Sequence, residues 1–193
     1  MSGLSAAPFW PTLLEWLPAD EDPERPQIQL ATLDEHGAPD IRTVLLTEFD
    51  DEGFWFNTDA ASRKAQQLAA DARVAIAMLW PGFTWQLCVQ GLASPAPRHR
   101  LERAYARRSP YLRQLAWQNT AELAQLPHAQ RVERWRVFQA EHDVAALEPP
   151  EVWTGYLVRP SRLTFWRADA ETASQRVEYR LEDGAWTRWL LPG

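Results

Sequence analysis

The stretch IRTVLLTEFDDEGFWFNTDAASRKAQQL, residues 41–68, carries the pattern that decides the fold. Residues 41–50 and the shorter run 54–58 are rich in apolar and β-branched residues, and the acidic DDEG between them is typical of a turn. Residues 61–71 then show the apolar spacing of a helix, with Ala65, Leu68 and Ala69 on its apolar face. The stretch therefore predicts two strands joined by a turn and followed directly by a short helix.

Further strands are predicted on both sides of this stretch. A short helix at residues 8–17 and an acidic, proline-bearing loop at residues 18–26 precede a strand at residues 28–34. After the central helix, residues 73–80 form a continuous apolar run, which predicts a strand buried on both faces. Residues 84–96 predict its neighbour.

A helical insertion is predicted at residues 98–148. Residues 98–117 and 121–142 predict two helices within it, joined near residues 118–120, and two prolines close the insertion.

The remaining chain returns to strand patterns. Residues 152–160 and 162–169 predict two strands, and residues 175–192 predict a hairpin about Asp183 and Gly184. Strands connected mostly by short turns favour an antiparallel sheet that closes or nearly closes into a barrel. The sequence thus predicts a mainly β fold with a helical insertion.

Length and composition limit the classes of protein. The 193 residues, 46% of them hydrophobic, predict a single domain over residues 1–193, with an N-terminal helix and acidic loop at residues 1–26. No apolar run reaches the ~18 residues that argue for a membrane span. The start lacks the basic residues of a signal peptide, and Cys88 alone cannot form an intrachain disulfide. A cytoplasmic location is expected by default, and the net charge of −6 disfavours nucleic-acid binding.

Common catalytic and nucleotide-binding motifs are missing from the sequence. Neither GxGxxG nor GxxxxGK[ST] occurs, so a Rossmann or P-loop site is not supported. The serine hydrolase motif GxSxG is absent as well. The four histidines and the cysteine are scattered, so no metal site is predicted.

Arg42 lies inside the apolar strand RTVLL. Because side chains alternate along a strand, Arg42, Val44 and Leu46 share one face, and Thr43 and Leu45 share the other. An arginine among apolar residues is costly unless it is paired or binds an anion. The alternative is an arginine at the strand end that reaches solvent.

The string NTxxxSRK runs from the end of a strand into the first turn of a helix. It contains Asn57, Thr58, Ser62, Arg63 and Lys64, the last being the only lysine in the chain. Free backbone N–H groups, hydroxyls and two cations at a helix start form the kind of site that binds phosphate. The alternative is an ordinary helix cap, with Ser62 as the capping residue and a solvated Arg-Lys pair.

These strings, in this order and spacing, resemble the pyridoxamine 5′-phosphate oxidase family of FMN-binding split barrels. A later pair, Trp85-Gln86, and the C-terminal strings VWTGYLVRPSRLTFW and QRVEYRLEDGAWTRWLLP support the resemblance. Trp166 is followed ten residues later by Arg176, as in that family. The resemblance implies that Gln86 hydrogen-bonds the flavin, although the pattern alone also fits a polar residue on an outer face.

The resemblance implies FMN as the cofactor. It places the RTVLL strand with Arg42 along the ribityl-phosphate, and Arg63 and Lys64 at the phosphate. Asn57 stands where the family has tyrosine, and Asn119 stands where it has serine. The family completes each site with residues of a partner subunit, which implies a homodimer with FMN at the interface. The residues expected to bind FMN are Arg42, Thr43, Val44, Leu45, Asn57, Thr58, Ser62, Arg63, Lys64, Gln86, Gln118, Asn119, Trp166 and Arg176.

The positions that bind substrate in the family differ in this chain. Thr47 replaces a lysine, and Thr172 and Ser174 replace an arginine and a histidine. Tyr105 matches the family's tyrosine, and the arginine four residues further on in the family falls at Ser109 here, or at Arg108 after a shift of one residue. The weakly predicted substrate positions are therefore Thr47, Tyr105, Arg108, Thr172 and Ser174.

The resemblance predicts an FMN-dependent oxidoreductase with an altered substrate site, whose substrate is unidentified. The sequence assigns no catalytic residue. Two alternatives stay open: a genuine pyridoxamine or pyridoxine 5′-phosphate oxidase, and a non-catalytic flavin-binding protein.

Overall fold

The computed structural model describes residues 3–19 and 26–193 of the chain. Within them, nine strands form one antiparallel sheet in the order β2-β1-β5-β6-β7-β4-β3, and the hairpin of β8 and β9 extends it from β7. The strands are β1 (Gln27–Leu33), β2 (Pro39–Leu45), β3 (Glu48–Asp50), β4 (Gly53–Asp59), β5 (Arg73–Leu79), β6 (Trp85–Pro95), β7 (Trp153–Arg167), β8 (Gln175–Glu182) and β9 (Ala185–Pro192).

The sheet forms a nearly closed barrel because its two end strands, β2 and β3, are consecutive in the chain. Leu46 and Thr47 connect them. The backbone N–H of Leu46 donates to the carbonyl oxygen of Pro26 beside β1 (2.9 Å), and that of Thr47 donates to the carbonyl oxygen of Trp55 in β4 (2.8 Å). The single strand predicted at residues 41–50 is therefore wrong, since the chain passes from one sheet edge to the other at these two residues.

Strand β7 links the barrel to the C-terminal hairpin. Its first half pairs with β4, its second half pairs with β8, and β6 runs along its other side. The sequence predicted two strands here, whereas the structure has one strand of 15 residues. Pro160 lies at a β-bulge opposite Gly91, where the carbonyl oxygen of Arg159 approaches too closely for any side chain at position 91.

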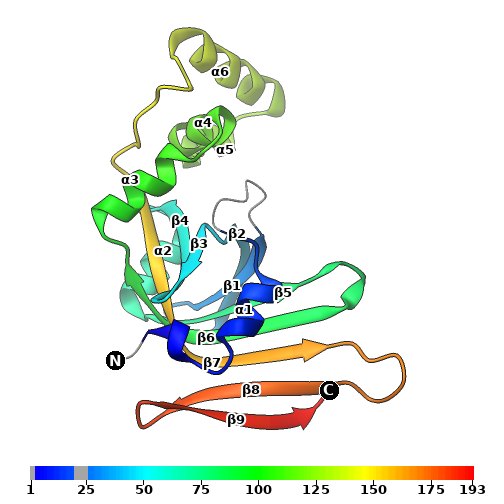
Figure 1. The fold of residues 1–193 in the computed structure, drawn as a ribbon. Helices are drawn as coiled ribbons and strands as arrows, with labels where there is room; N and C mark the ends of the chain where they lie inside the picture. The colour runs from blue at the N-terminus through cyan, green and yellow to red at the C-terminus, as the bar shows by residue number, and fades with distance from the viewer. Residues whose placement is uncertain (1–2, 20–25) are drawn as a thin grey trace.

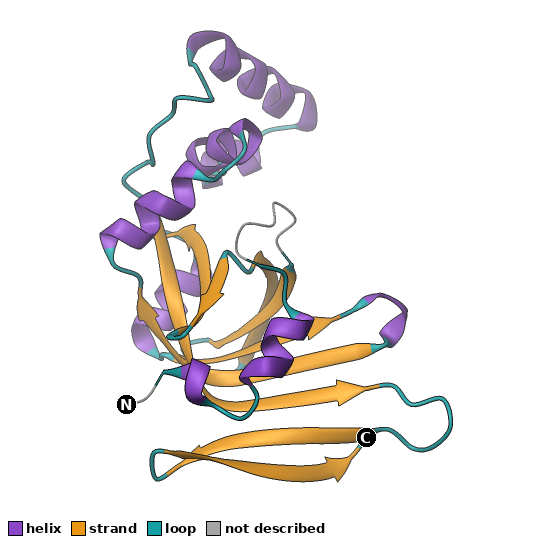
Figure 2. Cartoon of the chain, in the orientation of Figure 1, coloured by secondary structure: helices purple, strands orange, loops and turns teal. Residues whose placement is uncertain are grey.

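The helical insertion contains four α-helices instead of the two predicted. They are α3 (Arg98–Ala106), α4 (Pro110–Gln118), α5 (Ala121–Gln125) and α6 (His128–Glu141). New helices start beside Pro110 and Pro127, because proline lacks the N–H that continues a helix. Figures 1 and 2 show these helices rising from one end of the sheet, away from the β8–β9 hairpin.

Shorter helices flank the first strands. They are η1 (Leu4–Ala6), α1 (Trp10–Trp16), α2 (Arg63–Ala70) and η2 (Pro81–Phe83), so α1 is shorter than the predicted helix 8–17. In α2, Ala65 and Leu68 are buried as predicted. Ala69 is exposed, and Gln67 is buried instead, because it takes part in a polar network described below.

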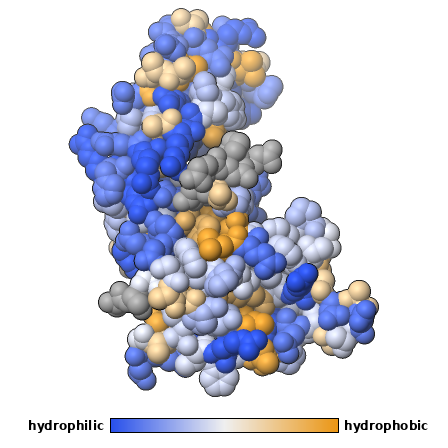
Figure 3. Space-filling model, viewed as in Figure 1, coloured by the Kyte–Doolittle hydropathy of each residue, from blue (hydrophilic) through white to orange (hydrophobic). Residues whose placement is uncertain are grey.

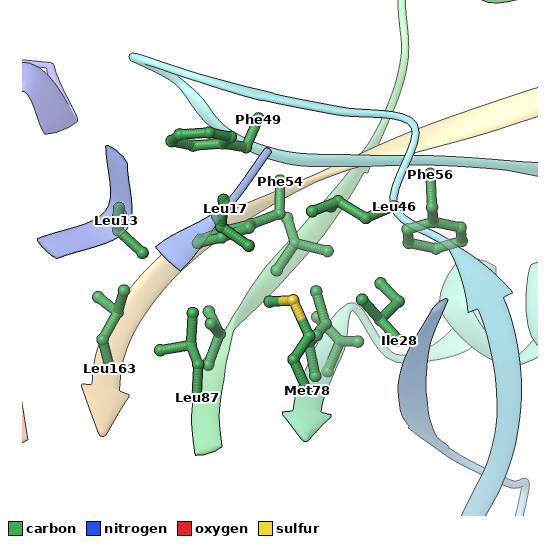
Figure 4. Packing of buried hydrophobic residues seen from close by; sticks show 14 of the residues in the cluster. Leu13, Leu17, Ile28, Leu46, Phe49, Phe54, Phe56, Met78, Leu87 and Leu163 are labelled. Carbon is green, nitrogen blue, oxygen red and sulfur yellow. The ribbon is translucent and has the colours of Figure 1, made fainter. Parts of the chain in front are cut away.

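The core lies between the strands and the N-terminal segment, where Leu13 and Leu17 pack among apolar side chains of the sheet (Figure 4). Leu30, Ile76, Val89 and Leu163 face one another across four strands, and each is at most 1% exposed. The burial predicted for both faces of residues 73–80 is wrong. Alternate residues of β5 are buried and Leu79 is 61% exposed, because only the inner face of the sheet points into the core.

Surface hydropathy differs between the two ends of the molecule. In the view of Figure 3 the helical insertion is largely hydrophilic, whereas apolar residues gather around the sheet.

Candidate functional site

Hydroxyls and cations meet where β4 ends and α2 begins. The Lys64 ammonium donates to the Thr58 hydroxyl (3.0 Å), and the Thr58 and Ser62 hydroxyls lie 3.2 Å apart. Ser62 occupies the N-cap position of α2, but its hydroxyl makes no hydrogen bond to the helix backbone. We call Arg42, Thr58, Ser62, Arg63 and Lys64 the cationic cluster.

Arg42 is folded back into the protein instead of reaching solvent. Its side chain is 19% exposed, and Nη2 lies 2.7 Å from Asp40 Oδ2 and donates to Gln67 Oε1 (2.8 Å). Nη1 donates to the Thr32 hydroxyl and to the carbonyl oxygen of Leu30. The alternative interpretation of Arg42 as a solvated residue at the strand end is therefore wrong. Four acceptors hold its guanidinium in place.

The strand alternation predicted around Arg42 is confirmed. Arg42 and Val44 are half-buried, whereas Thr43 and Leu45 are exposed on the other face of β2. The Thr43 hydroxyl donates to Gln29 Oε1 (3.1 Å). One strand thus contributes to both sides of the sheet.

Positive charge is concentrated in the cationic cluster. Burial, followed by the charge of Arg42, lowers the pKa of Lys64, while the charges of Asp59 and Asp40 act in the opposite direction. Arg63 is mostly exposed, and its Nη1 lies 3.6 Å from Asp40 Oδ2. Ammonium, guanidinium and hydroxyl donors at the start of a helix fit a phosphate, so the donor set matches the predicted phosphate end of FMN.

A second set of predicted cofactor residues forms a row on the outer face of the sheet. Gln86 of β6 pairs with Trp166 of β7, and Trp166 pairs with Arg176 of β8. Residues directly opposite one another share a face, so the three side chains lie side by side. We call Gln86, Trp166 and Arg176 the outer row. Gln86 Nε2 donates to the sulfur of Cys88 (3.2 Å), and the Trp166 and Phe83 rings lie 4.6 Å apart.

The last two predicted cofactor residues lie at the end of α4. The Gln118 amide donates to the carbonyl oxygen of Arg134 (3.3 Å) and accepts from Gln114 (2.7 Å), and Asn119 is the C-cap of α4. Figure 1 shows α4 and β8 at opposite ends of the molecule. One chain therefore does not bring Gln118 and Asn119 to the same place as Arg176.

Two positions at which the sequence departs from the family are paired with each other. The Thr47 hydroxyl donates to Asn57 Oδ1 (2.9 Å), and Asn57 Nδ2 donates to the carbonyl oxygen of Thr154 in β7 (3.3 Å). Both residues line a small cavity of about 10 Å³ together with Trp55, whose buried indole N–H has no hydrogen-bond partner. A cavity of that size holds about one water molecule.

Tyr105 and Arg108 come together around Trp153. The Tyr105 ring contacts the Trp153 ring edge-on at 5.3 Å, and the Arg108 guanidinium lies 4.5 Å from the centre of that ring. The Tyr105 hydroxyl is buried, and burial raises its pKa, although an interaction with the Trp117 indole acts in the opposite direction. Burial lowers the pKa of Arg108 to about 10, so it stays charged at neutral pH. Its hydrogen bonds go to the carbonyl oxygen of Leu112, which leaves its charge uncompensated by those bonds.

Thr172 and Ser174 lie in the connection between β7 and β8. The Ser174 hydroxyl accepts from the Trp166 indole N–H (2.9 Å), and the Thr172 backbone N–H donates to Asp169 (3.1 Å). Ser174 therefore adjoins the outer row, whereas Thr47 lies in the barrel wall.

Sequence reasoning missed the residues that hold Arg42. Thr32 is 1% exposed and Gln67 is 8% exposed, and their side chains are hydrogen-bonded to each other as well as to Arg42. Asp40 precedes Arg42 by two residues and so shares its face of β2, which is a signal that strand alternation supplies. The roles of Thr32 and Gln67 depend on contacts between distant segments.

Two kinds of feature are absent from residues 3–19 and 26–193. No group of three or more His, Cys, Asp and Glu side chains is placed to hold a metal ion. No helix in this part of the chain is both long and apolar enough to cross a lipid bilayer.

Comparison with known proteins gives consistent matches along the chain. A family model described as pyridoxamine 5′-phosphate oxidase matches residues 19–141, and one described as the pyridoxine 5′-phosphate oxidase C-terminal dimerisation region matches residues 153–192. A pyridoxine/pyridoxamine 5′-phosphate oxidase of Ralstonia pickettii is 36% identical over 160 residues, which cover 82% of this chain and 74% of the relative.

Two solved structures share the fold. One is a pyridoxamine 5′-phosphate oxidase-related, FMN-binding protein of Nostoc punctiforme, with a TM-score of 0.74, 20% identity and coverage of 98% of this chain and 99% of that one. The other is PhzG of Burkholderia lata in complex with tetrahydrophenazine-1-carboxylic acid, with a TM-score of 0.72, 22% identity and coverage of 89% and 83%. The split-barrel fold predicted from the sequence is confirmed. The matched dimerisation region contains Trp166 and Arg176 and indicates a homodimer.

Proposed function

Because the chain belongs to the pyridoxamine 5′-phosphate oxidase family, we propose that it is an FMN-dependent oxidoreductase with its active sites between two copies of the chain. FMN is the cofactor, and when bound it supplies the capacity for hydride transfer. The observation that carries the proposal is the cationic cluster, which assembles the predicted phosphate donors within one chain.

The cationic cluster holds the FMN phosphate. Lys64 and Arg63 supply charge-assisted hydrogen bonds, and the Thr58 and Ser62 hydroxyls add neutral donors beside the start of α2. A phosphate carries nearly two negative charges and so neutralises the positive charge of the cationic cluster, which neutral water molecules cannot do. Arg42 attracts the phosphate through its charge alone, because its terminal nitrogens already donate to protein acceptors.

The flavin end of each site is completed by a second copy of the chain. The outer row and the end of α4 lie at opposite ends of one chain, so both serve one cofactor only if two chains contribute. The outer face also carries apolar side chains that water contacts in the single chain, such as Ile41 (65% exposed) and Leu79 (61%), which lies opposite Gln86. A symmetric dimer can bury such a face.

The substrate differs from pyridoxamine 5′-phosphate. Thr47 is neutral and is hydrogen-bonded to Asn57, so this position offers no cation to a substrate phosphate. Tyr105, Trp153 and Arg108 instead offer an aromatic surface and a partly buried charge. These groups suit a small anionic substrate held by one cation and an aromatic surface.

A second candidate function is oxidation of pyridoxine and pyridoxamine 5′-phosphates themselves. It is favoured by the 36% identity to the Ralstonia pickettii relative named for that activity. In that case Arg108 takes over the role of the missing cations.

Two measurements test these proposals. Flavin absorbance of the purified protein shows whether it carries FMN. Steady-state turnover of the FMN-loaded protein against both phosphates, beside an authentic oxidase, separates the altered substrate site from the second candidate. A protein purified without flavin that also fails to bind added FMN would contradict both.

A further inference from the structure

Asp40 lies inside the cationic cluster, and the proposed function gives it no role. Its Oδ2 atom is 2.7 Å from Arg42 Nη2 and 3.6 Å from Arg63 Nη1, and it accepts a hydrogen bond from Gln67 Nε2 (3.0 Å). The hydrogen bond from Gln67 and the two arginine charges lower the pKa of Asp40, although partial burial opposes them. Asp40 is therefore an anion at neutral pH, placed among the groups that would bind another anion.

The four terminal donors of Arg42 already have protein partners. A guanidinium has four N–H groups on its two terminal nitrogens. Nη1 donates to the carbonyl oxygen of Leu30 and the hydroxyl of Thr32, and Nη2 donates to Gln67 and lies against Asp40. Arg42 therefore attracts a phosphate through its charge, and its terminal nitrogens are not free to bind one.

Arg63 and Lys64 are the cations that remain able to donate to a phosphate. The Arg63 side chain is 79% exposed, and its ion pair with Asp40 is long, at 3.6 Å. Lys64 donates to the uncharged Thr58 hydroxyl. A phosphate at the start of α2 therefore competes with Asp40 for Arg63, and the Asp40 charge repels it.

We propose that Asp40 is an internal counter-anion that limits how strongly this chain distinguishes FMN from riboflavin. The carboxylate occupies Arg63 and offsets part of the cationic charge, so it weakens recognition of the phosphate and leaves recognition of the flavin ring unchanged. This inference rests on the proposed function, because it takes the cationic cluster as the phosphate site.

The experiment measures the dissociation constants of FMN and riboflavin for the flavin-free full-length protein, by quenching of flavin fluorescence. The quantity of interest is the riboflavin constant divided by the FMN constant, because riboflavin lacks only the phosphate. Asp40→Asn keeps the shape and the hydrogen-bonding capacity toward Gln67 and removes the charge. It is expected to raise the ratio about five- to tenfold through tighter FMN binding, an effect that shrinks in high salt.

The control variant is Asp71→Asn. Asp71 also forms an ion pair with an arginine two residues away, Arg73, at 2.5 Å, but it lies at the other end of α2. Its removal is expected to leave the ratio unchanged. Asp40→Ser serves as a second variant, and thermal unfolding of each variant confirms that it is folded.

Lys64→Ala separates failure of this inference from failure of the proposed function. If Lys64→Ala lowers the ratio while Asp40→Asn and Asp40→Ser leave it unchanged or lower it, the phosphate site stands and the role given to Asp40 is overturned. If Lys64→Ala also leaves the ratio unchanged, the cationic cluster does not bind the phosphate and both ideas fail. A ratio that rises only because riboflavin binds more weakly also contradicts the inference.

Discussion

Asn57 and Thr58 are neighbours on β4, yet they belong to two regions that differ in kind. The Thr58 hydroxyl is bound by Lys64 in the cationic cluster, where the residues match the family pattern. The Asn57 amide is bound by Thr47 in a neutral pair, where both residues depart from that pattern. One short piece of barrel wall thus holds both a residue of the proposed phosphate site and a neutral pair in which both positions differ from the family pattern.

The largest expected effect lies on the substrate side of this comparison. The protein should oxidise pyridoxamine and pyridoxine 5′-phosphate with a kcat/KM roughly 10²- to 10⁴-fold below that of an authentic oxidase. Thr47, Thr172 and Ser174 replace three cationic or ionisable groups, and the loss of two charged contacts at ~1.5–3 kcal/mol each gives this range. Steady-state oxygen consumption by the FMN-loaded protein measures it.

Turnover within tenfold of the authentic enzyme would contradict that expectation. It would mean that Arg108 or Arg113 supplies the missing charge, and the second candidate function would then replace the first. Arg108→Ala distinguishes the two arginines, because Arg113 already donates to the carbonyl oxygens of Arg108, Ala106 and Ala145.

The cofactor side is tested by Lys64→Ala. This variant should bind FMN ~10- to 100-fold more weakly, because a charge-assisted hydrogen bond to phosphate contributes ~1.5–3 kcal/mol. Riboflavin binding should change little. Wild-type protein at ~100 times the FMN dissociation constant should gain ~2.7 kcal/mol in its free energy of unfolding, and Lys64→Ala should gain only ~0.4–1.4 kcal/mol at the same FMN concentration.

The third prediction concerns whether two chains contribute residues to one FMN site. Arg176→Ala should loosen FMN by roughly tenfold while the barrel stays folded, since Arg176 is an exposed residue of β8. When Lys64→Ala and Arg176→Ala chains are mixed, each heterodimer should regain one intact site, because the unchanged residues of the two chains meet there.

Flavin titration of the mixed protein measures that recovery. Tight binding that reappears only after mixing supports a shared site. A protein that is monomeric at micromolar concentration and still binds FMN would contradict the shared site.

Local patterns were sufficient for most of the fold and failed where distant segments decide the path. The central helix follows from periodicity, and the breaks beside Pro110 and Pro127 follow from proline chemistry. The break at Leu46 does not, because it depends on a hydrogen bond to the carbonyl oxygen of Pro26, which lies just before β1 and far from Leu46 in the sequence. The continuity of β7 through Pro160 is set by the bulge opposite Gly91, which no local pattern shows.

The site shows the same limit. Strand alternation placed Arg42 on the face that it occupies, and the order of the motifs placed Lys64 and Thr58 together. Two of the acceptors that hold Arg42 are Thr32 of β1 and Gln67 of α2. Both lie in other elements of the chain, so only folding brings them to this side chain. The pairing of Thr47 with Asn57 likewise joins two changes that the sequence presents as separate.

The smallest expected effect concerns that neutral pair. Thr47→Val and Asn57→Ala should each lower the free energy of unfolding, and the double variant should be less destabilised than the sum of the two. The hydrogen bond between Thr47 Oγ1 and Asn57 Oδ1, 2.9 Å long and partly buried, should appear as a coupling energy of ~0.5–1.5 kcal/mol. Denaturant unfolding of the flavin-free protein measures each free energy and excludes cofactor binding as the cause.

Additive effects would mean that the two residues act independently, so that the changes on the substrate side were not one linked rearrangement. A coupling of the expected size, together with an unchanged FMN-to-riboflavin preference in Thr47→Val, would separate the neutral pair from the cationic cluster although Asn57 and Thr58 are adjacent in the chain.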